Sequence, residues 1–366
     1  MRARTITLLT GLALLLFSIS AVAQLNVPRA SQMASVSQRV GITDITITYS
    51  RPSVNGREIW GKLVPYGMNN LGFGTATAAP WRAGANENTT IEFTHDVKVE
   101  GKDIQAGTYG LHIEVKENGT ATVIFSHNST SWGSFFYDEK EDALRVDVTT
   151  GETHHHELLT YEFNEVAPTS TTASLAWEKK EIPFKIEVPV TEIVLTDIRK
   201  SLKSSPGFSR ENWEQAARYA MNNRGDLNEA MQWINNAIQG QFYSKKTVAN
   251  LAVKAAILDK MGKKAESLAL IDEAADMATT AELNVLGYQM LNAKEYDRAL
   301  KFFKRNVKNN PKDANVYDSL GEAYKVMGDR KNAIKNLRKS LSLNPPANVR
   351  ANSIKLLKEL GVETDE

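Results

Sequence analysis

Hydrophobic residues recur with two different periods along this chain, and the period changes near Val190. Before that position apolar residues alternate with polar ones, which is typical of strands that bury one face. After it they recur at helical spacing, in units of about 34 residues. We therefore expect a β-unit followed by an α-helical unit.

The alternation predicts eight short strands in the first half. Their apolar positions lie at residues 45–49, 91–93, 109–115, 123–125, 144–148, 159–163, 175–177 and 184–186. Between them there is no helical segment long enough for a crossover, which favours an antiparallel β-sandwich over a parallel sheet. Hairpin turns are expected at residues 99–102 and 116–119, where Gly or Asn accepts a positive φ.

The helical half begins with an expected connecting helix at residues 191–203, interrupted at 204–207, after which Ser209 can cap the next helix. A basic surface is expected over residues 301–360, which contain 14 Lys and Arg against 5 Asp and Glu. It is either a solvated convex face or a site for an acidic peptide, a polyanionic glycan or anionic lipid headgroups.

The first 23 residues have the pattern of a cleavable export signal. Arg2 and Arg4 precede an apolar stretch at residues 8–22, and Ala21 and Ala23 supply a small-x-small cleavage site. This stretch is short for a spanning helix, and no later segment approaches about 20 apolar residues. We expect a signal peptide, a periplasmic or secreted location and no transmembrane segment. The absence of cysteine excludes disulfides and cysteine-ligated zinc, and it fits a Gram-negative periplasm.

Length and charge limit the function classes further. With 366 residues and 42% hydrophobic content, two ordinary domains can each build a core. A formal net charge of +1 gives no electrostatic support for binding nucleic acid.

Two loop segments, residues 51–67 and 80–90, fit neither period and hold the candidate binding residues. Charged, amide and flat aromatic side chains gather there and in one later loop: Arg51, Arg57, Trp60, Trp81, Arg82, Asn86, Glu87 and Trp132. This mixture suits a glycan, a peptide or an anionic small molecule in a shallow site. The alternative is that the same arginines and tryptophans brace the loops by bonding carboxylates and backbone carbonyls.

Catalytic and metal-binding patterns are absent from the sequence. There is no Gly-x-Ser-x-Gly, His-Glu-x-x-His or phosphate-binding Gly-Lys-Ser/Thr motif. The consecutive histidines 154–156 cannot all reach one ion from a strand, and we expect them in a solvated turn. His95 and His127 share parity with core positions and are expected at the core rim, whereas His112 should face outward. The sequence therefore favours no catalytic residue, no metal ligand and no cofactor.

Several of these loop motifs occur in the same order in one known family. Residues 51–67, 80–90 and 106–111, with Trp132-Gly133, resemble the DUF2911 family, a group of exported bacterial domains without an assigned activity. The resemblance covers roughly residues 32–188. One departure is the stretch 68–79, which lengthens the loop between the Pro-Tyr-Gly and Trp-Arg motifs and bears on how open a cleft is there.

The second half resembles tetratricopeptide repeats. The pattern is plainest in Tyr317, Leu320-Gly321, Tyr324, Ala333, Leu337 and Pro345, and it recurs one period earlier in Leu283, Leu286-Gly287, Ala299, Phe303 and Pro311. Ala265 and Ala230 are expected at the small helix-contact position of the two earlier repeats, and residues 348–360 at a closing helix. The resemblance implies a protein or peptide partner.

These observations predict a signal peptide (1–23), a β-sandwich (24–189), a linker (190–208) and a TPR-like α-helical solenoid (209–361). We interpret the chain as an exported, non-enzymatic binding or scaffold protein. Its loops would hold a glycan or an anionic small molecule. The alternatives are a cell-envelope glycan hydrolase that uses Arg57, Arg82 and Glu87, with the repeats as a targeting module, and a purely structural assembly factor. An enzyme requires an acid and a base that converge in a cleft.

Overall fold

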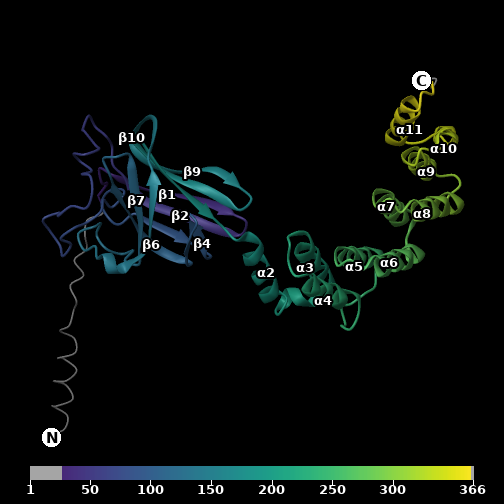
Figure 1. Ribbon diagram of the computed structural model, residues 1–366, viewed down its shortest axis with the longest axis horizontal. Helices are drawn as coiled ribbons and strands as arrows, with labels where there is room; N and C mark the ends of the chain where they lie inside the picture. Colours follow the sequence, from purple (N-terminus) through teal and green to yellow (C-terminus); the bar gives the residue numbers. More distant parts are fainter. Residues whose placement is uncertain (1–26, 364–366) are drawn as a thin grey trace, which may run out of the picture. The chain divides into compact units, whose positions relative to one another are not determined.

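The computed structural model describes residues 27–363, so the expected export signal lies outside the described residues. The chain divides into two compact units, Met1–Val190 and Thr191–Glu366. Figure 1 shows strands in the first and helices in the second, which confirms the expected fold class. Among the described helices, none has the length and apolar character required to cross a membrane.

The β-unit consists of two antiparallel sheets. One has the order β1-β2-β3-β6-β7-β8 and the other the order β5-β4-β10-β9. The strands are β1 (Gln32–Val40), β2 (Thr43–Arg51), β3 (Thr90–Phe93), β4 (Val97–Val99), β5 (Lys102–Ile104), β6 (Gly107–Val115), β7 (Thr120–Ser126), β8 (Asp142–Thr149), β9 (Gly151–Ala167) and β10 (Ser170–Glu187). Fully buried rings from both sheets meet between them, for example Phe125 of β7 and Phe184 of β10, whose centroids are 6.0 Å apart.

The predicted strands are present, but two of them are parts of one longer strand. Residues 175–177 and 184–186 both belong to β10, whose pairing with β9 shifts register around Glu178. Glu178 has a φ of 55°, the backbone of a bulge. An extra residue changes which face the following side chains occupy, so the alternation looks like two separate segments.

Three strands were not predicted, because they carry little alternating signal. β1 is an edge strand with a mostly exposed sequence, and β4 and β5 are three residues each. Both expected hairpin turns are confirmed. Glu100 and Gly101 join β4 to β5 with φ values of 48° and 76°, and Gly119 precedes β7 with a φ of 81°.

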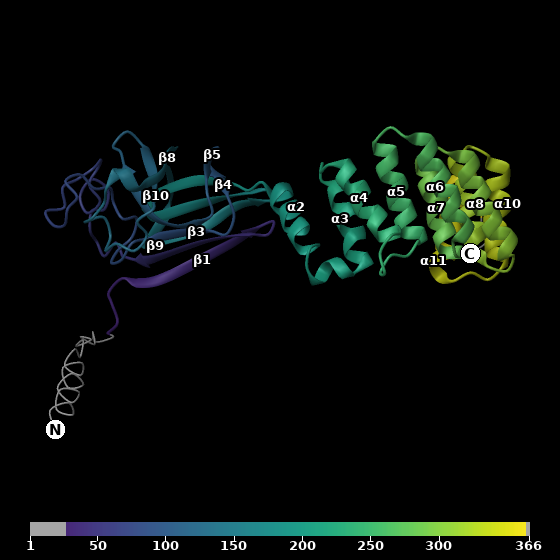
Figure 2. The same cartoon turned by 90° about the horizontal axis from the view of Figure 1, so that it is seen from below.

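Ten α-helices form the second unit within the described residues, and most of them stand side by side in pairs (Figure 2). They are α2 (Val190–Ser201), α3 (Arg210–Asn222), α4 (Leu227–Ile238), α5 (Val248–Lys260), α6 (Lys264–Met277), α7 (Thr280–Asn292), α8 (Tyr296–Asn309), α9 (Ala314–Val326), α10 (Arg330–Ser342) and α11 (Ala347–Glu359). Ser209 occupies the N-cap position of α3 as expected, but its hydroxyl bonds the Glu211 carboxylate and not the helix backbone.

Close packing within the pairs α7/α8 and α9/α10 explains the Leu-Gly motif of the last two repeats. A Cβ on Gly321 of α9 would lie 2.7 Å from Cγ of Leu337 on α10. A Cβ on Gly287 of α7 would lie 2.7 Å from the ring of Phe303 on α8. Glycine therefore lets a large side chain of the second helix approach the backbone of the first.

The small position on the second helix of each pair is filled by Ala230, Ala299 and Ala333, all fully buried. In the remaining pair the prediction of Ala265 is wrong. Ala265 is exposed, and the fourth residue of α6, the position of the three alanines in their helices, is the buried Ser267. At the end of the array α11 packs Leu356 and Leu357 against Leu337, as expected of a closing helix.

Candidate functional site

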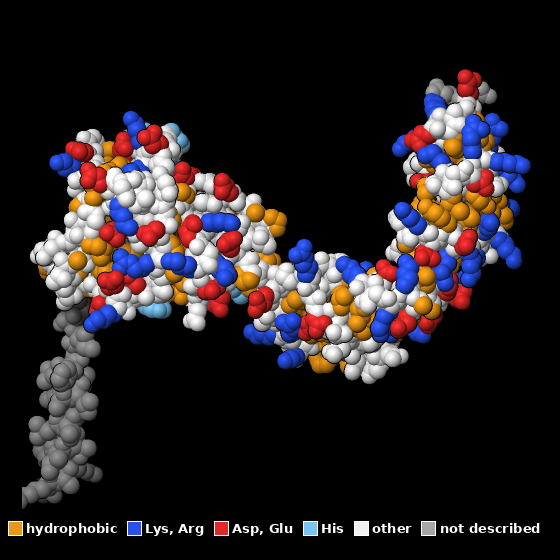
Figure 3. Space-filling view, in the orientation of Figure 1, with side chains coloured by type: hydrophobic (Ala, Val, Ile, Leu, Met, Phe, Trp, Pro, Cys, Tyr) orange, Lys and Arg blue, Asp and Glu red, His pale blue; other side chains and the backbone are white. Residues whose placement is uncertain are grey.

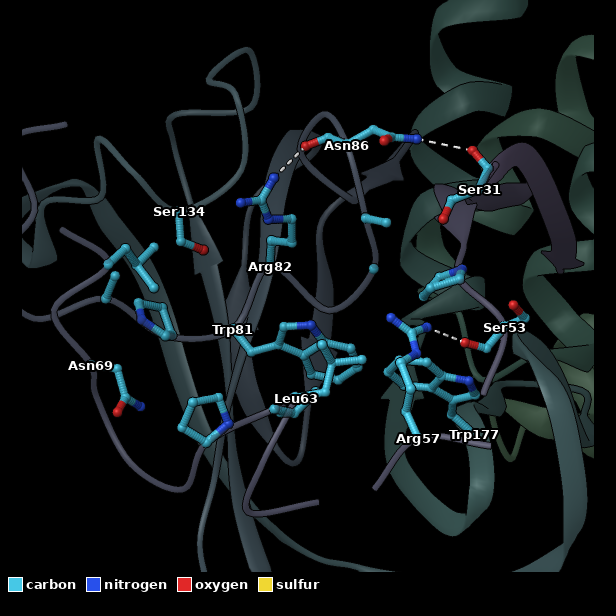
Figure 4. Close-up of a pocket in the computed structure, with 18 of the residues that line it drawn as sticks. Ser31, Ser53, Arg57, Leu63, Asn69, Trp81, Arg82, Asn86, Ser134 and Trp177 are labelled. Atoms are coloured by element: carbon cyan, nitrogen blue, oxygen red, sulfur yellow. Dashed lines mark hydrogen bonds between the residues drawn. The ribbon is translucent and has the colours of Figure 1, made fainter. Parts of the chain in front are cut away.

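A cavity of about 560 Å³ lies among the loops of the β-unit (Figure 4). Its lining comes from residues within 30–31, 52–57, 63–71 and 79–86, together with Ser134 and Trp177. These are largely the two segments whose sequence fits no strand period, and the cavity has the size of a small-molecule site.

The charged side chains that the structure describes in the cavity lining are all positive. Among the described residues that line it, Arg57 and Arg82 are charged, and none is aspartate or glutamate. The other polar side chains are amides and hydroxyls, including Asn69, Asn86 and Ser134.

Arg82 is half-buried and has no carboxylate partner within the part of the chain that the structure describes. Its Nη1 donates to the backbone oxygen of Asn86 at 2.6 Å, and its guanidinium lies 4.8 Å from the centroid of the Phe135 ring. Burial lowers the pKa of Arg82 from its usual value. Asn86 has a φ of 63°, and its Nδ2 donates to the backbone oxygen of Ser31 at 2.9 Å. The loop at residues 82–86 therefore turns tightly beside the guanidinium.

The second arginine and an indole cluster form other parts of the wall. Arg57 donates from Nε to the backbone oxygen of Val54 at 3.1 Å and from Nη2 to that of Ser53. Trp81 stacks on Trp177 with centroids 5.9 Å apart and an interplanar angle of 15°. The half-buried Trp60 packs edge-on against both indoles but does not line the cavity.

Arg51 lies outside the cavity and braces the two sheets. Its Nε donates to the backbone oxygen of Leu159 at 2.9 Å, and its Nη2 donates to Oγ1 of Thr160 at 2.7 Å. Arg51 ends β2 and both partners lie in β9, so the side chain joins strands of different sheets.

Glu87 and Trp132 also lie outside the cavity, at an exposed position beside it. Glu87 forms an ion pair with Arg29, whose guanidinium lies 5.5 Å from the centroid of Trp132. Of the eight candidate residues, the structure therefore brings Arg57, Trp81, Arg82 and Asn86 together around one cavity.

A buried pair of polar residues behind the cavity is not predicted from the sequence. Oγ of Ser134, which lines the cavity, lies 2.9 Å from Nδ1 of His112. His112 is only 2% exposed, so the prediction that it faces outward to solvent is wrong. Its parity places it on the face of the sheet opposite Leu111, but Tyr137 packs edge-on against its ring at 5.6 Å.

The sequence contains a signal for this burial. Ile124 is apolar at an outward parity position between the core residues Val123 and Phe125, which indicates that both faces of the strand are covered. In the structure Ile124 packs with Ala76 and Ala79, which belong to the lengthened loop 68–79. Burial first, and the nearby Arg82 charge second, lower the pKa of His112 to about 4.

The remaining histidines form no common site. Residues 154–156 lie in β9 and not in the expected turn. His95 is half-buried and within 3.1 Å of Oγ1 of Thr43, whereas His127 is exposed against the ring of Tyr109. Residues 27–363 contain no cluster of three His, Asp or Glu side chains suited to a metal ion.

Replacing Arg82 with alanine should lower the free energy of unfolding of the β-unit by about 1–3 kcal/mol, because the Asn86 carbonyl loses its donor and Phe135 loses its contact. The matched control is Arg29→Ala, which removes an exposed ion pair and should cost at most about 1 kcal/mol. Urea unfolding of both variants measures the difference. Equal stability of Arg82→Ala and the unchanged protein would show that these contacts do not hold the loop.

Comparisons with known proteins match both units. Residues 31–186 match the family described as "Protein of unknown function (DUF2911)", and residues 314–346 match a tetratricopeptide repeat. A 48-residue segment, 13% of the chain, is 44% identical to cellulose synthase operon protein C of Escherichia coli K12 and to its putative counterpart in strain O157:H7. The match spans only 4% of the length of these curated relatives.

Three similar solved structures each cover less than half of this chain, and two of them are described as TPR proteins. A crystal structure of MamA is 18% identical, with 42% of this chain and 89% of that chain covered and a TM-score of 0.31. YrrB, described as a TPR protein with an unusual peptide-binding site, is 17% identical over 45% and 84%, with a TM-score of 0.30. The C-terminal part of a TPR repeat-containing protein from Cytophaga hutchinsonii is 15% identical over 46% and 75%, with a TM-score of 0.33.

Proposed function

From a DUF2911 domain at residues 31–186 and a tetratricopeptide repeat at residues 314–346, we propose that this chain is an exported, non-enzymatic binding protein. The β-unit binds an anionic small molecule in its loop cavity. The helical repeats bind a protein or peptide partner, so the chain links a ligand to an assembly.

The observation that carries the first part is the charge of the cavity lining. Arg57 and Arg82 face a space whose described lining contains no carboxylate. A half-buried guanidinium without a counter-ion has lost solvation that no charge offsets, and a bound oxyanion would supply charge-assisted hydrogen bonds. Arg82 already has one Nη held by Asn86, which fixes its orientation before a ligand arrives.

The cavity supports binding better than glycan hydrolysis. Most glycoside hydrolases need two carboxyl groups, one on each side of the scissile bond. Glu87, the carboxylate named in the hydrolase alternative, is exposed and paired with Arg29 outside the cavity. The residues of this cavity can hold and orient an anion, but they supply no acid and base pair of that kind.

The charge of the last repeats favours a partner with acidic side chains. Lys and Arg side chains gather over α8 to α11 (Figure 3), where residues 301–360 contain 14 basic against 5 acidic residues. Two of the lysines, Lys304 and Lys339, lie about 6 Å from the tyrosine rings of Tyr324 and Tyr317. Such a surface attracts an acidic segment by long-range charge, and its affinity should fall as the salt concentration rises.

Isolation of the protein from the periplasm of its native cell tests this proposal. Small molecules released from the purified protein are compared with those from an Arg57→Gln variant and from the exposed control Arg29→Gln. We expect one anionic compound to be at least about tenfold depleted in Arg57→Gln and retained in the control. Equal recovery from all three proteins, or a neutral compound, would contradict anion binding.

The intact mass of the same sample tests export. We expect the chain to begin near Gln24, after removal of residues 1–23. Recovery of the protein with Met1 in place, or from the cytoplasm, would contradict it.

A further inference from the structure

The lining of the cavity differs from one end to the other, and this difference bears on the ligand. In Figure 4, Arg82, Asn86 and Ser31 lie at the upper end of the cavity, while Trp81 and Leu63 lie below them, with Arg57 and Asn69 also in the lower part. An oxyanion bonded to Arg82 would therefore leave the rest of the ligand beside the Trp81 indole and the apolar residues.

The apolar part continues to the surface. Leu63 is 45% exposed and Leu71 is 38% exposed, although both line the cavity. Single exposed leucines are common on protein surfaces, but two that come from separate segments and border the same cavity form an apolar mouth. A ligand that covered them would remove this surface from water.

The lengthened loop 68–79 supplies part of this mouth. Leu71 comes from this loop, as does the exposed Phe73, whose ring lies 5.5 Å from that of Phe135. Gly74, with a φ of 80°, lets the loop approach residue 135 so closely that a Cβ would lie 2.1 Å from the Phe135 oxygen. The ring of Phe135 in turn lies under the guanidinium of Arg82. Loop 68–79 therefore packs against Phe135, whose ring contacts the guanidinium of Arg82.

We propose that the ligand of this cavity is an anionic amphiphile, an oxyanion such as a carboxylate or phosphate joined to an alkyl chain, and that loop 68–79 sets the preference for the chain. This inference rests on the proposed anion binding and names the class of the anion. Arg82 takes the oxyanion, Arg57 adds to the positive charge of the cavity, and Trp81, Leu63 and Leu71 cover the alkyl part. A small hydrophilic anion or a sugar acid would leave the two leucines in water.

Calorimetric titration of the full mature protein with acetate, hexanoate, octanoate, octyl phosphate and 1-octanol tests the inference. Each methylene removed from water adds up to about fourfold in affinity. We expect octanoate or octyl phosphate to bind at least about tenfold more tightly than acetate, and 1-octanol at least about tenfold more weakly than the better of the two anions.

A matched pair of surface variants distinguishes binding at the mouth of the cavity from nonspecific hydrophobic association. Leu71→Ser should weaken binding of the eight-carbon anion about three- to tenfold and leave acetate unchanged. Val166→Ser, at an exposed position of β9 that does not line the cavity, should leave both unchanged. Thermal melting of both variants verifies that they are folded.

The outcomes distinguish this inference from the proposed function. If neither octanoate nor octyl phosphate binds more tightly than acetate, or if Leu71→Ser and Val166→Ser behave alike, an amphiphilic ligand is excluded and anion binding stands. If 1-octanol binds as tightly as the anions, or if no anion in the series binds, anion binding itself is overturned together with the amphiphile.

Discussion

Replacement of Trp177 with alanine is expected to lower the free energy of unfolding of the β-unit by about 3–5 kcal/mol. Trp177 is only 1% exposed, stacks on Trp81 and contacts the edge of Trp60. Its removal leaves a void that the rigid strand β10 cannot close, and it deletes part of the cavity wall. Urea unfolding, followed by far-ultraviolet circular dichroism, measures the loss.

The matched control for this prediction is Trp132→Ala. Trp132 is 48% exposed and contacts the guanidinium of Arg29, so its truncation should change stability by no more than about 0.5 kcal/mol. If the two tryptophan variants lose similar stability, the indole cluster is not the anchor of the loops.

Acidification should destabilise the β-unit through His112. The pKa of this histidine is about 4 in the folded protein and 6.5 when unperturbed, so between these values the unfolded chain takes up the proton and the folded chain does not. Stability is therefore fully present above about pH 6.5, falls as the pH drops toward 4, and loses about 3 kcal/mol from this group in total. Urea unfolding at a series of pH values from 7.5 to 4 measures the slope.

Two variants assign that slope to the buried residue. His112→Asn keeps an amide near Ser134 but cannot titrate, so its stability should depend less on pH by about the same 3 kcal/mol. His127→Asn, at an exposed position, should retain the full dependence. A slope that is unchanged in His112→Asn would mean that other groups cause the acid sensitivity.

The sequence predicts the strands best where a single face is buried and the register is regular. Residues 45–49 alternate between buried and half-buried positions and lie in one strand, β2. In β10 the bulge at Glu178 changes the parity, and alternation alone cannot reveal an inserted residue. The repeats are easier to predict because their contacts are local, as between Gly321 and Leu337, sixteen positions apart.

The candidate site could be predicted only in part, since loops have no period that reports on their partners. No feature of the sequence distinguishes Arg57 and Arg82 from Arg51. In the structure, however, Arg51 donates hydrogen bonds to residues of β9 that lie more than a hundred positions away. The alternation at residues 175–177 predicts Trp177 in a strand, but its place in the cavity wall depends on how the loops fold against that part of β10. Ser134 lies in a loop and belongs to no recognisable sequence motif. It is identified only in the structure, by its contact with His112.

The most direct test of anion binding is a crystal structure of the protein purified from its native cell without denaturation. We predict electron density for a ligand in the cavity of the β-unit, with an oxyanion within about 3.2 Å of the guanidinium of Arg82 or Arg57. A cavity that holds only ordered water, or a ligand bound away from both arginines, would contradict the account.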